Sequence, residues 1–157
     1  MSAIADALAE VRARIDRAAH AAAREPETVR LVAVSKTKPA SAVREAYEAG
    51  QRDFGENYAQ ELAEKAKELA DLPDLRWHFI GHLQSNKAKF VAPVAALVHT
   101  IDSASLAREL GKRAAKEGRG KLAVLVEVNV GGEAQKHGAA PADLATLLDA
   151  VDAEPNL

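Results

Sequence analysis

Short apolar runs alternate along the chain with longer amphipathic segments. The apolar runs are rich in Val, Ile, Leu and aromatic residues and predict five strands, at residues 31–34, 52–57, 75–82, 95–102 and 122–130. The intervening segments predict helices at residues 40–49, 57–72, 104–117 and 142–151, and a further helix entered through the turn at 83–87. Strands and helices that alternate in this way are typical of βαβ units, so we expect a parallel sheet with right-handed crossovers.

A further helix is predicted before the first strand, at residues 2–23. Its apolar residues recur at intervals of four, three and four, as on one face of a helix: Ile4, Leu8, Val11 and Ile15. Because this helix precedes every strand, we expect it to pack outside the sheet or over one of its ends.

Composition narrows the class of protein. A chain of 157 residues, 48% hydrophobic and 28% charged, is long enough for one domain with a substantial core and has an ordinary globular composition. The net charge of −2 gives no general attraction to nucleic acid or to anionic membranes. The absence of cysteine excludes disulfides, thiolate metal sites and cysteine nucleophiles. No signal peptide and no bilayer-spanning run is visible, so we expect a cytoplasmic protein.

The first apolar run ends in a lysine and is closed by Pro39. On a strand, Val32, Val34 and Lys36 share one face, so Lys36 continues a core-facing row at the point where the strand ends. Desolvation and the neighbouring Lys38 both disfavour a charged amine, and an uncharged lysine can attack an aldehyde to form a Schiff base. From these residues alone, the simpler interpretation is a strand-end lysine whose amine reaches water.

Polar residues also follow the other predicted strands, at the edge where parallel α/β folds carry their function: Asn57, His82, Asp102 and Asn129. The ordinary explanations are that Asn57 caps a helix, His82 is a hydrogen-bonded loop histidine and Asp102 starts a helix. Glu127 shares a face with Asn129 inside an apolar strand. A buried polar pair needs partners, so either an internal network or a polar lumen facing a ligand is expected there.

Other chemistry has little support in the sequence. No glycine-rich phosphate loop follows the first strand. His78 and His82 are four residues apart, but on a strand this spacing separates them along one face, and no HExxH motif occurs. We therefore expect no metal site.

Four motifs, in order, carry a resemblance to a known family. They are LVAVSKTKP at 31–39, FGENY at 54–58, WHFIGHLQSNK at 77–87 and HTIDS at 99–103. Together they resemble the pyridoxal phosphate homeostasis protein family, whose members are single-domain proteins with the alanine racemase N-terminal type of barrel. The resemblance implies an α/β fold, a (β/α)8 TIM barrel, of which residues 1–157 supply about five βα units plus the N-terminal helix.

The resemblance also implies roles for individual residues. Lys36 aligns with the lysine that binds pyridoxal 5'-phosphate (PLP) as an internal aldimine, and Asn57 and Tyr58 match the motif that lines the cofactor. His82 lies in the loop near the cofactor ring. Lys136 falls where family members carry a further lysine implicated in secondary handling of the cofactor.

Three functions are consistent with these residues. The resemblance implies a non-enzymatic protein that carries PLP as a Schiff base on Lys36 and regulates its supply to PLP-dependent apo-enzymes. The alternative is a PLP-dependent amino-acid racemase, which shares the barrel but needs a second base, commonly a tyrosine, and only Tyr47 and Tyr58 are present. The third is a structural or binding fragment without a cofactor. We expect no nucleic-acid or membrane partner and a monomer or weak dimer.

The sequence departs from the family in length. Family members continue for about three further strands, which carry the serine and Gly-Thr backbone that grip the phosphate and an arginine that faces the pyridine nitrogen. We therefore expect a single barrel domain over residues 1–157 that is incomplete at its C-terminus. Five strands cannot close a barrel, so two edges should be left unpaired, with weak, labile cofactor binding and poor solubility.

Overall fold

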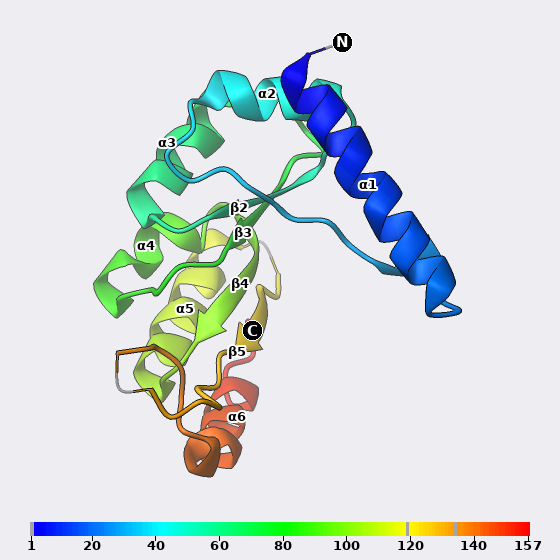
Figure 1. Cartoon of the computed structure of the whole chain (residues 1–157). Coiled ribbons are helices and arrows are strands. Elements are labelled where there is room, and N and C mark those ends of the chain that lie inside the picture. Colours follow the sequence, from blue (N-terminus) through cyan, green and yellow to red (C-terminus); the bar gives the residue numbers. More distant parts are fainter. Residues whose placement is uncertain (1, 119, 134) are drawn as a thin grey trace.

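A five-stranded, all-parallel sheet forms the centre of the computed structural model, which describes residues 2–118, 120–133 and 135–157 (Figure 1). The strands lie in chain order: β1 (Ala33–Val34), β2 (Asp53–Glu56), β3 (Arg76–Phe79), β4 (Ala95–Ile101) and β5 (Ala123–Val126). Each pairs in parallel with its neighbour in sequence, which confirms the predicted parallel sheet. Strands β1 and β5 are its two edges.

Helices follow the strands on the outer side of a curved arc (Figure 1). They are α1 (Ala3–Ala21), α2 (Ala40–Glu48), α3 (Ala59–Glu68), α4 (Ala88–Val91), α5 (Ala104–Glu117) and α6 (Leu144–Asp152), with 3-10 turns at Pro26–Thr28, Ser85–Lys87 and Pro141–Asp143. Helix α1 packs against α2 at the β1 end of the arc, outside the sheet as expected. No helix in the described ranges is long and apolar enough to cross a bilayer.

Local sequence sets the ends of several helices. The Ser2 Oγ accepts a hydrogen bond from the Ala5 amide at 3.2 Å and caps α1, and the Ser103 Oγ accepts one from Leu106 at 3.4 Å and caps α5. Gly118 follows α5 in the left-handed conformation at φ 63°, where glycine carries no steric penalty. The predicted helices 2–23 and 104–117 are confirmed.

The start of α3 differs from the prediction. The helix begins at Ala59, and Tyr58 occupies the N-cap position without a side-chain hydrogen bond, so the expectation that Asn57 caps this helix is wrong. Instead the backbone of Asn57 lies against Gly81, where an added Cβ would lie 2.2 Å from the Asn57 carbonyl oxygen. This close tertiary contact takes Asn57 out of the helix.

Strand β1 is shorter and more exposed than the sequence predicts. Only Ala33 and Val34 pair with β2, and Val34 is 54% exposed. On the opposite edge strand, Leu125 is 50% exposed. The expectation that Val34 and Lys36 face a packed core is therefore wrong in this structure, where both side chains are exposed.

The apolar core lies between the sheet and its outer helices. Phe54 and Phe79 are each 1% exposed, and the Phe54 and Trp77 rings pack with centroids 6.1 Å apart. Since side chains alternate along a strand, the residues next to these three turn to the inner side of the arc. That inner side therefore receives Asp53 of β2 and His78 of β3, whereas Glu56, two residues after Phe54, lies on the outer side.

A polar row crosses three strands on the inner side: Asp53, His78 and His99. His78 lies between the other two, with Nε2 2.8 Å from Asp53 Oδ1 and Nδ1 2.9 Å from His99 Nε2. Arg76 donates two hydrogen bonds to Asp53, at 2.8 and 2.7 Å, and together with His78 holds the pKa of Asp53 down at about 2. Burial lowers the pKa of His99, and the neighbouring His78 acts in the same direction. The row links β2, β3 and β4.

We predict that Asp53 contributes an acid-sensitive part of the stability. A carboxyl whose pKa is lowered by folding stabilises the protein above its ordinary pKa of 3.8, and this contribution is lost as the pH falls towards 2. The shift corresponds to at most about 2 kcal/mol in the free energy of unfolding. Urea unfolding of wild type and Asp53→Asn between about pH 7 and pH 2 measures it.

The Asp53→Asn variant should be less stable at neutral pH and should show a shallower loss between about pH 4 and pH 2. Asp71→Asn is the matched control, because Asp71 pairs with Arg44 on the surface, where both side chains are exposed. Equal pH dependence in Asp53→Asn and wild type would contradict the assignment.

Candidate functional site

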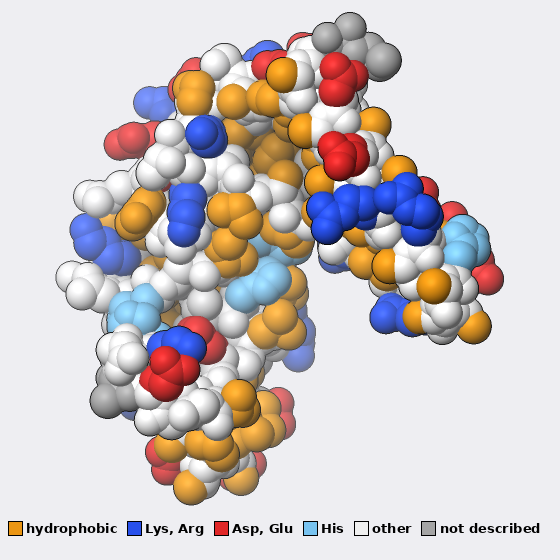
Figure 2. All heavy atoms as spheres, in the orientation of Figure 1, with side chains coloured by type: hydrophobic (Ala, Val, Ile, Leu, Met, Phe, Trp, Pro, Cys, Tyr) orange, Lys and Arg blue, Asp and Glu red, His pale blue; other side chains and the backbone are white. Residues whose placement is uncertain are grey.

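The carboxyl ends of the parallel strands lie along one edge of the sheet, and the predicted site residues lie in the loops that leave this edge. Lys36 comes after β1, Asn57 and Tyr58 after β2, and His82 after β3. The space-filling view shows the inner side of the arc as a hollow, with histidines and hydrophobic side chains exposed on it (Figure 2). The topology therefore brings the predicted residues to neighbouring loops.

Lys36 is exposed, between a buried Ser35 and an exposed Thr37. Thr37 has φ 62°, a left-handed conformation that a β-branched residue rarely adopts. The chain turns sharply at this point and leaves the Lys36 side chain open to solvent. Lys36 follows the end of β1, as predicted. Its exposure agrees with the simpler interpretation, a lysine whose amine reaches water, and not with a desolvated amine.

A buried charged cluster lies beneath the Lys36 turn, made of Glu56, Glu61 and Lys65. The Lys65 ammonium donates to Glu56 Oε1 at 2.7 Å, to Glu61 Oε1 at 2.6 Å and to the Ser35 carbonyl at 2.7 Å. The Glu56 side chain is fully buried and that of Lys65 is 7% exposed. A buried ion pair is costly to break, because a lone partner stays charged in a medium that solvates it poorly.

This cluster holds the backbone on both sides of Lys36. The Ser35 hydroxyl donates to Glu56 Oε1 at 2.7 Å, and the Thr37 amide donates to Glu61 Oε1 at 2.6 Å. The left-handed Thr37 is thus held by a charge-assisted hydrogen bond from its own amide. Two anchors within three residues fix the point from which the Lys36 side chain leaves the backbone.

Asn57 contributes a buried acceptor at the same edge. Its Oδ1 is buried and has no hydrogen-bond partner among the described residues. Buried side-chain oxygens are rarely left in this state, so the atom is available to a polar ligand. The neighbouring Gly81 is fixed by the Thr100 hydroxyl, which donates to its carbonyl at 2.7 Å. Tyr58 is 57% exposed and presents its ring to solvent.

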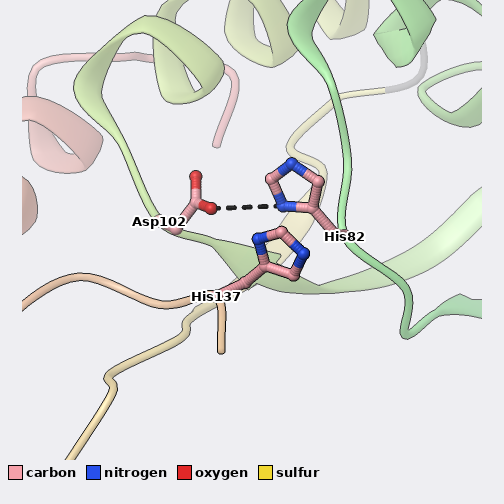
Figure 3. A group of neighbouring side chains, drawn as sticks. All are labelled: His82, Asp102 and His137. Atoms are coloured by element: carbon pink, nitrogen blue, oxygen red, sulfur yellow. Dashed lines mark ion pairs between the residues drawn. The ribbon is translucent and has the colours of Figure 1, made fainter. Parts of the chain in front are cut away.

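The loops after β3, β4 and β5 bring together His82, Asp102 and His137, which we call the His–Asp–His cluster (Figure 3). His82 Nδ1 lies 3.3 Å from Asp102 Oδ2. The His82 and His137 rings stack at 3.7 Å between centroids with an interplanar angle of 9°. Asp102 directly precedes the α5 cap, as predicted, and in addition pairs with His82.

The loop after β5 explains part of the predicted polar pair. The side-chain amide of Asn129 donates a hydrogen bond to the backbone carbonyl of Glu133 at 2.9 Å and so holds this loop in place. Lys136 is exposed and forms an ion pair with Glu133. Strand β5 ends at Val126, so Glu127 and Asn129 follow the strand, and the prediction of a buried pair inside it is wrong. The internal-network interpretation holds for Asn129 through its hydrogen bond within the loop. Glu127 is half-buried and lines the same surface pocket as Asn129 and Glu133.

Sequence reasoning found the strand-end residues and missed the side chains that support them: Glu56, Glu61, Lys65 and His137. One signal was available, the Glu61–Lys65 pair four residues apart on a predicted helix. Glu56 gave no clear signal, because its strand also carries Asp53 and has Phe54 as its large apolar residue. His137 gave no signal, since a loop has no period that shows what it faces. The structure joins His82 to Asp102 but shows no contact between Lys36 and His82.

The comparisons with known proteins agree with this fold. A family model described as "Alanine racemase, N-terminal domain" matches residues 7–157. A relative from Pseudomonas aeruginosa named "Pyridoxal phosphate homeostasis protein" is 55% identical over 157 residues, covering 100% of this chain and 67% of the relative. A relative of the same name from Escherichia coli K12 is 46% identical over 159 residues, covering 100% and 68%.

A solved structure is also similar to this chain in sequence and in fold. PipY of Synechococcus elongatus, solved with PLP bound, is 41% identical with a TM-score of 0.76, and the match covers 96% of this chain and 65% of that chain. The chain thus spans about two thirds of the length of these proteins.

We predict that the buried charged cluster is a large contributor to stability. In Lys65→Met, Glu56 loses its buried counter-ion, and the free energy of unfolding should fall by about 3 kcal/mol or more. Lys67→Met on the same helix is the control, because Lys67 is exposed. Urea unfolding at neutral pH measures both variants. A loss in Lys65→Met no greater than in Lys67→Met would show that the cluster is not a determinant of stability.

Proposed function

The chain belongs to the alanine racemase N-terminal domain family, among the pyridoxal phosphate homeostasis proteins, and on this basis we propose that it binds PLP on Lys36 as a non-enzymatic carrier. The observation that carries the proposal is the position of Lys36. Its exposed amine lies at the carboxyl edge of a parallel sheet, and the residues on both sides of Lys36 are anchored by hydrogen bonds. The PLP-bound PipY structure, at 41% identity, supports the same ligand.

The chemistry of Lys36 suits a carrier. A lysine amine condenses with an aldehyde to a Schiff base with loss of one water, and the linkage is reversible. An exposed amine lets other amines reach the linkage and take the aldehyde over. PLP supplies, when bound, the reactive aldehyde, and the anchored turn keeps the amine at one place on the strand edge. PLP-dependent apo-enzymes are the proposed recipients.

The residues around Lys36 fit part of this ligand. The unpaired Asn57 Oδ1 offers a buried acceptor. The exposed ring of Tyr58, and the face of the His82 ring that does not stack on His137, offer surfaces for an aromatic ring. We propose that these three residues line the ligand together with Lys36. Lys136, which is exposed and paired with Glu133, is proposed as a secondary site of aldehyde exchange.

We further propose that the five βα units belong to a (β/α)8 barrel. In such a barrel, further strands pair with the free edges of β1 and β5 and cover the inner side of the sheet. The exposed Val34 and Leu125 support this proposal, because both are apolar residues on the edge strands. The greater length of the relatives is consistent with it.

The racemase alternative has weaker support from the tyrosines. A racemase needs a second base on the far side of the ligand from the lysine. Tyr47 lies on α2 and has the Arg52 guanidinium 3.9 Å above its ring, away from the carboxyl edge of the sheet. Tyr58 alone follows a strand end. A carrier needs no second base, so we favour the non-enzymatic role.

We predict that Lys36 is the site of PLP attachment. Purified protein mixed with PLP should show the visible absorbance band of a Schiff base, and borohydride should convert it to a covalent adduct on the Lys36 peptide. Lys36→Ala should lose the band. Lys38→Ala is the matched control, since Lys38 is exposed on the same turn and should keep it. Absorbance spectra and peptide mass mapping measure the result.

Two results would overturn the proposed function. An equal band in Lys36→Ala would mean unspecific reaction of PLP with surface amines. Turnover of D- or L-alanine by the PLP-loaded protein would favour the racemase.

A further inference from the structure

The His–Asp–His cluster has the composition of a transition-metal site, which the sequence did not predict. Two imidazoles and one carboxylate are ligands that zinc accepts, and zinc sites with three protein ligands complete their coordination with water. The three side chains come from the loops after β3, β4 and β5, so the arrangement is created by the fold and not by a local motif.

The distances are close to those that a metal ion needs. One ligand atom from each residue lies within 4.8 Å of the other two, and His82 Nδ1 is already 3.3 Å from Asp102 Oδ2. Ligand atoms about 2.0–2.2 Å from a tetrahedral zinc ion are about 3.4 Å from one another. The His82–Asp102 pair therefore has the required spacing, and only His137 has to approach.

The stacked rings define the movement that binding requires. The planes of the His82 and His137 rings are only 9° from parallel, so the nitrogen lone pairs of the two rings lie in two separate, nearly parallel planes (Figure 3). One metal ion can lie in both planes only after one ring tilts. His137 is exposed and lies in the loop after β5, so its ring is free to tilt about its side-chain bonds. Asp102 is the more buried member, with 17% of its side chain exposed, and holds the fixed side of the site.

We propose that His82, Asp102 and His137 bind one zinc ion, with water as the remaining ligand. Imidazole nitrogen favours zinc, nickel and copper over magnesium and calcium, and the Irving–Williams order ranks copper above both nickel and zinc. The ion would tie the loop after β5 to the loops after β3 and β4. His82 is also proposed to line the PLP site, so zinc binding is tested on the protein without PLP, where failure of the PLP proposal does not affect the result.

The test is calorimetric titration of the PLP-free protein with zinc chloride. We expect one zinc ion per chain, with affinity reduced at least about tenfold in His137→Ala and in Asp102→Asn, because each removes a direct ligand. His20→Ala is the control. His20 is an exposed histidine on α1 whose ring lies 2.8 Å from the Asp16 carbonyl, and its loss should leave zinc binding unchanged. Magnesium chloride should give no binding at this site.

A second measurement separates a built site from scattered histidine binding. Cobalt(II) in place of zinc should give the visible absorption of a low-coordinate site, absent in His137→Ala, and zinc affinity should fall as the pH is lowered from about 7.5 to 5.5, since metal-bound imidazole must be unprotonated. Circular dichroism confirms that the variants fold. Unchanged zinc affinity in folded His137→Ala, or an equal loss in His20→Ala, would overturn the proposal.

Discussion

The ion pair between Lys65 and Glu56 is the interaction on which the Lys36 edge of the molecule depends. It joins α3 to the end of β2, and through the Ser35 carbonyl and hydroxyl it joins both to the end of β1. Both charged groups are buried, so neither can be solvated by water if the other is lost. The position of the backbone at Lys36 therefore depends on charged side chains that lie beneath the turn and do not face a ligand.

The two sides of the sheet are built from different forces. The outer side is closely packed and mostly apolar, with Phe54 and Phe79 buried beneath the helices, and it also holds the buried Glu56–Lys65 pair. The inner side carries the hydrogen-bonded row of Asp53, His78 and His99, and it is open at both edge strands. Packing on the outer side fixes the arc, and the polar row keeps three strands in register. An exposed lysine at the rim of such an arc suits a protein that accepts and releases an aldehyde.

The loops at the carboxyl edge form two groups with separate supports. Lys36 is held by the charged cluster of α3 and β2, whereas His82 is held by Gly81, Thr100 and Asp102. Asn57 lies between the groups, since it directly follows β2 and contacts Gly81. PLP binding at Lys36 and metal binding at His82 would therefore occur at the same edge of the sheet. Asn57 lies between the side chains that hold Lys36 and those that hold His82.

The sequence by itself determined the order of the elements and the strand end that carries Lys36. Apolar periodicity, the caps at Ser2 and Ser103 and the stop at Gly118 act within a few residues, so they can be read without the fold. Only the tertiary structure decided that buried charges hold the Lys36 turn, that the Asn57 oxygen is unpaired and that His137 reaches His82. Each of these depends on which strands and loops lie side by side, and contacts between residues distant in the chain leave no period in the sequence.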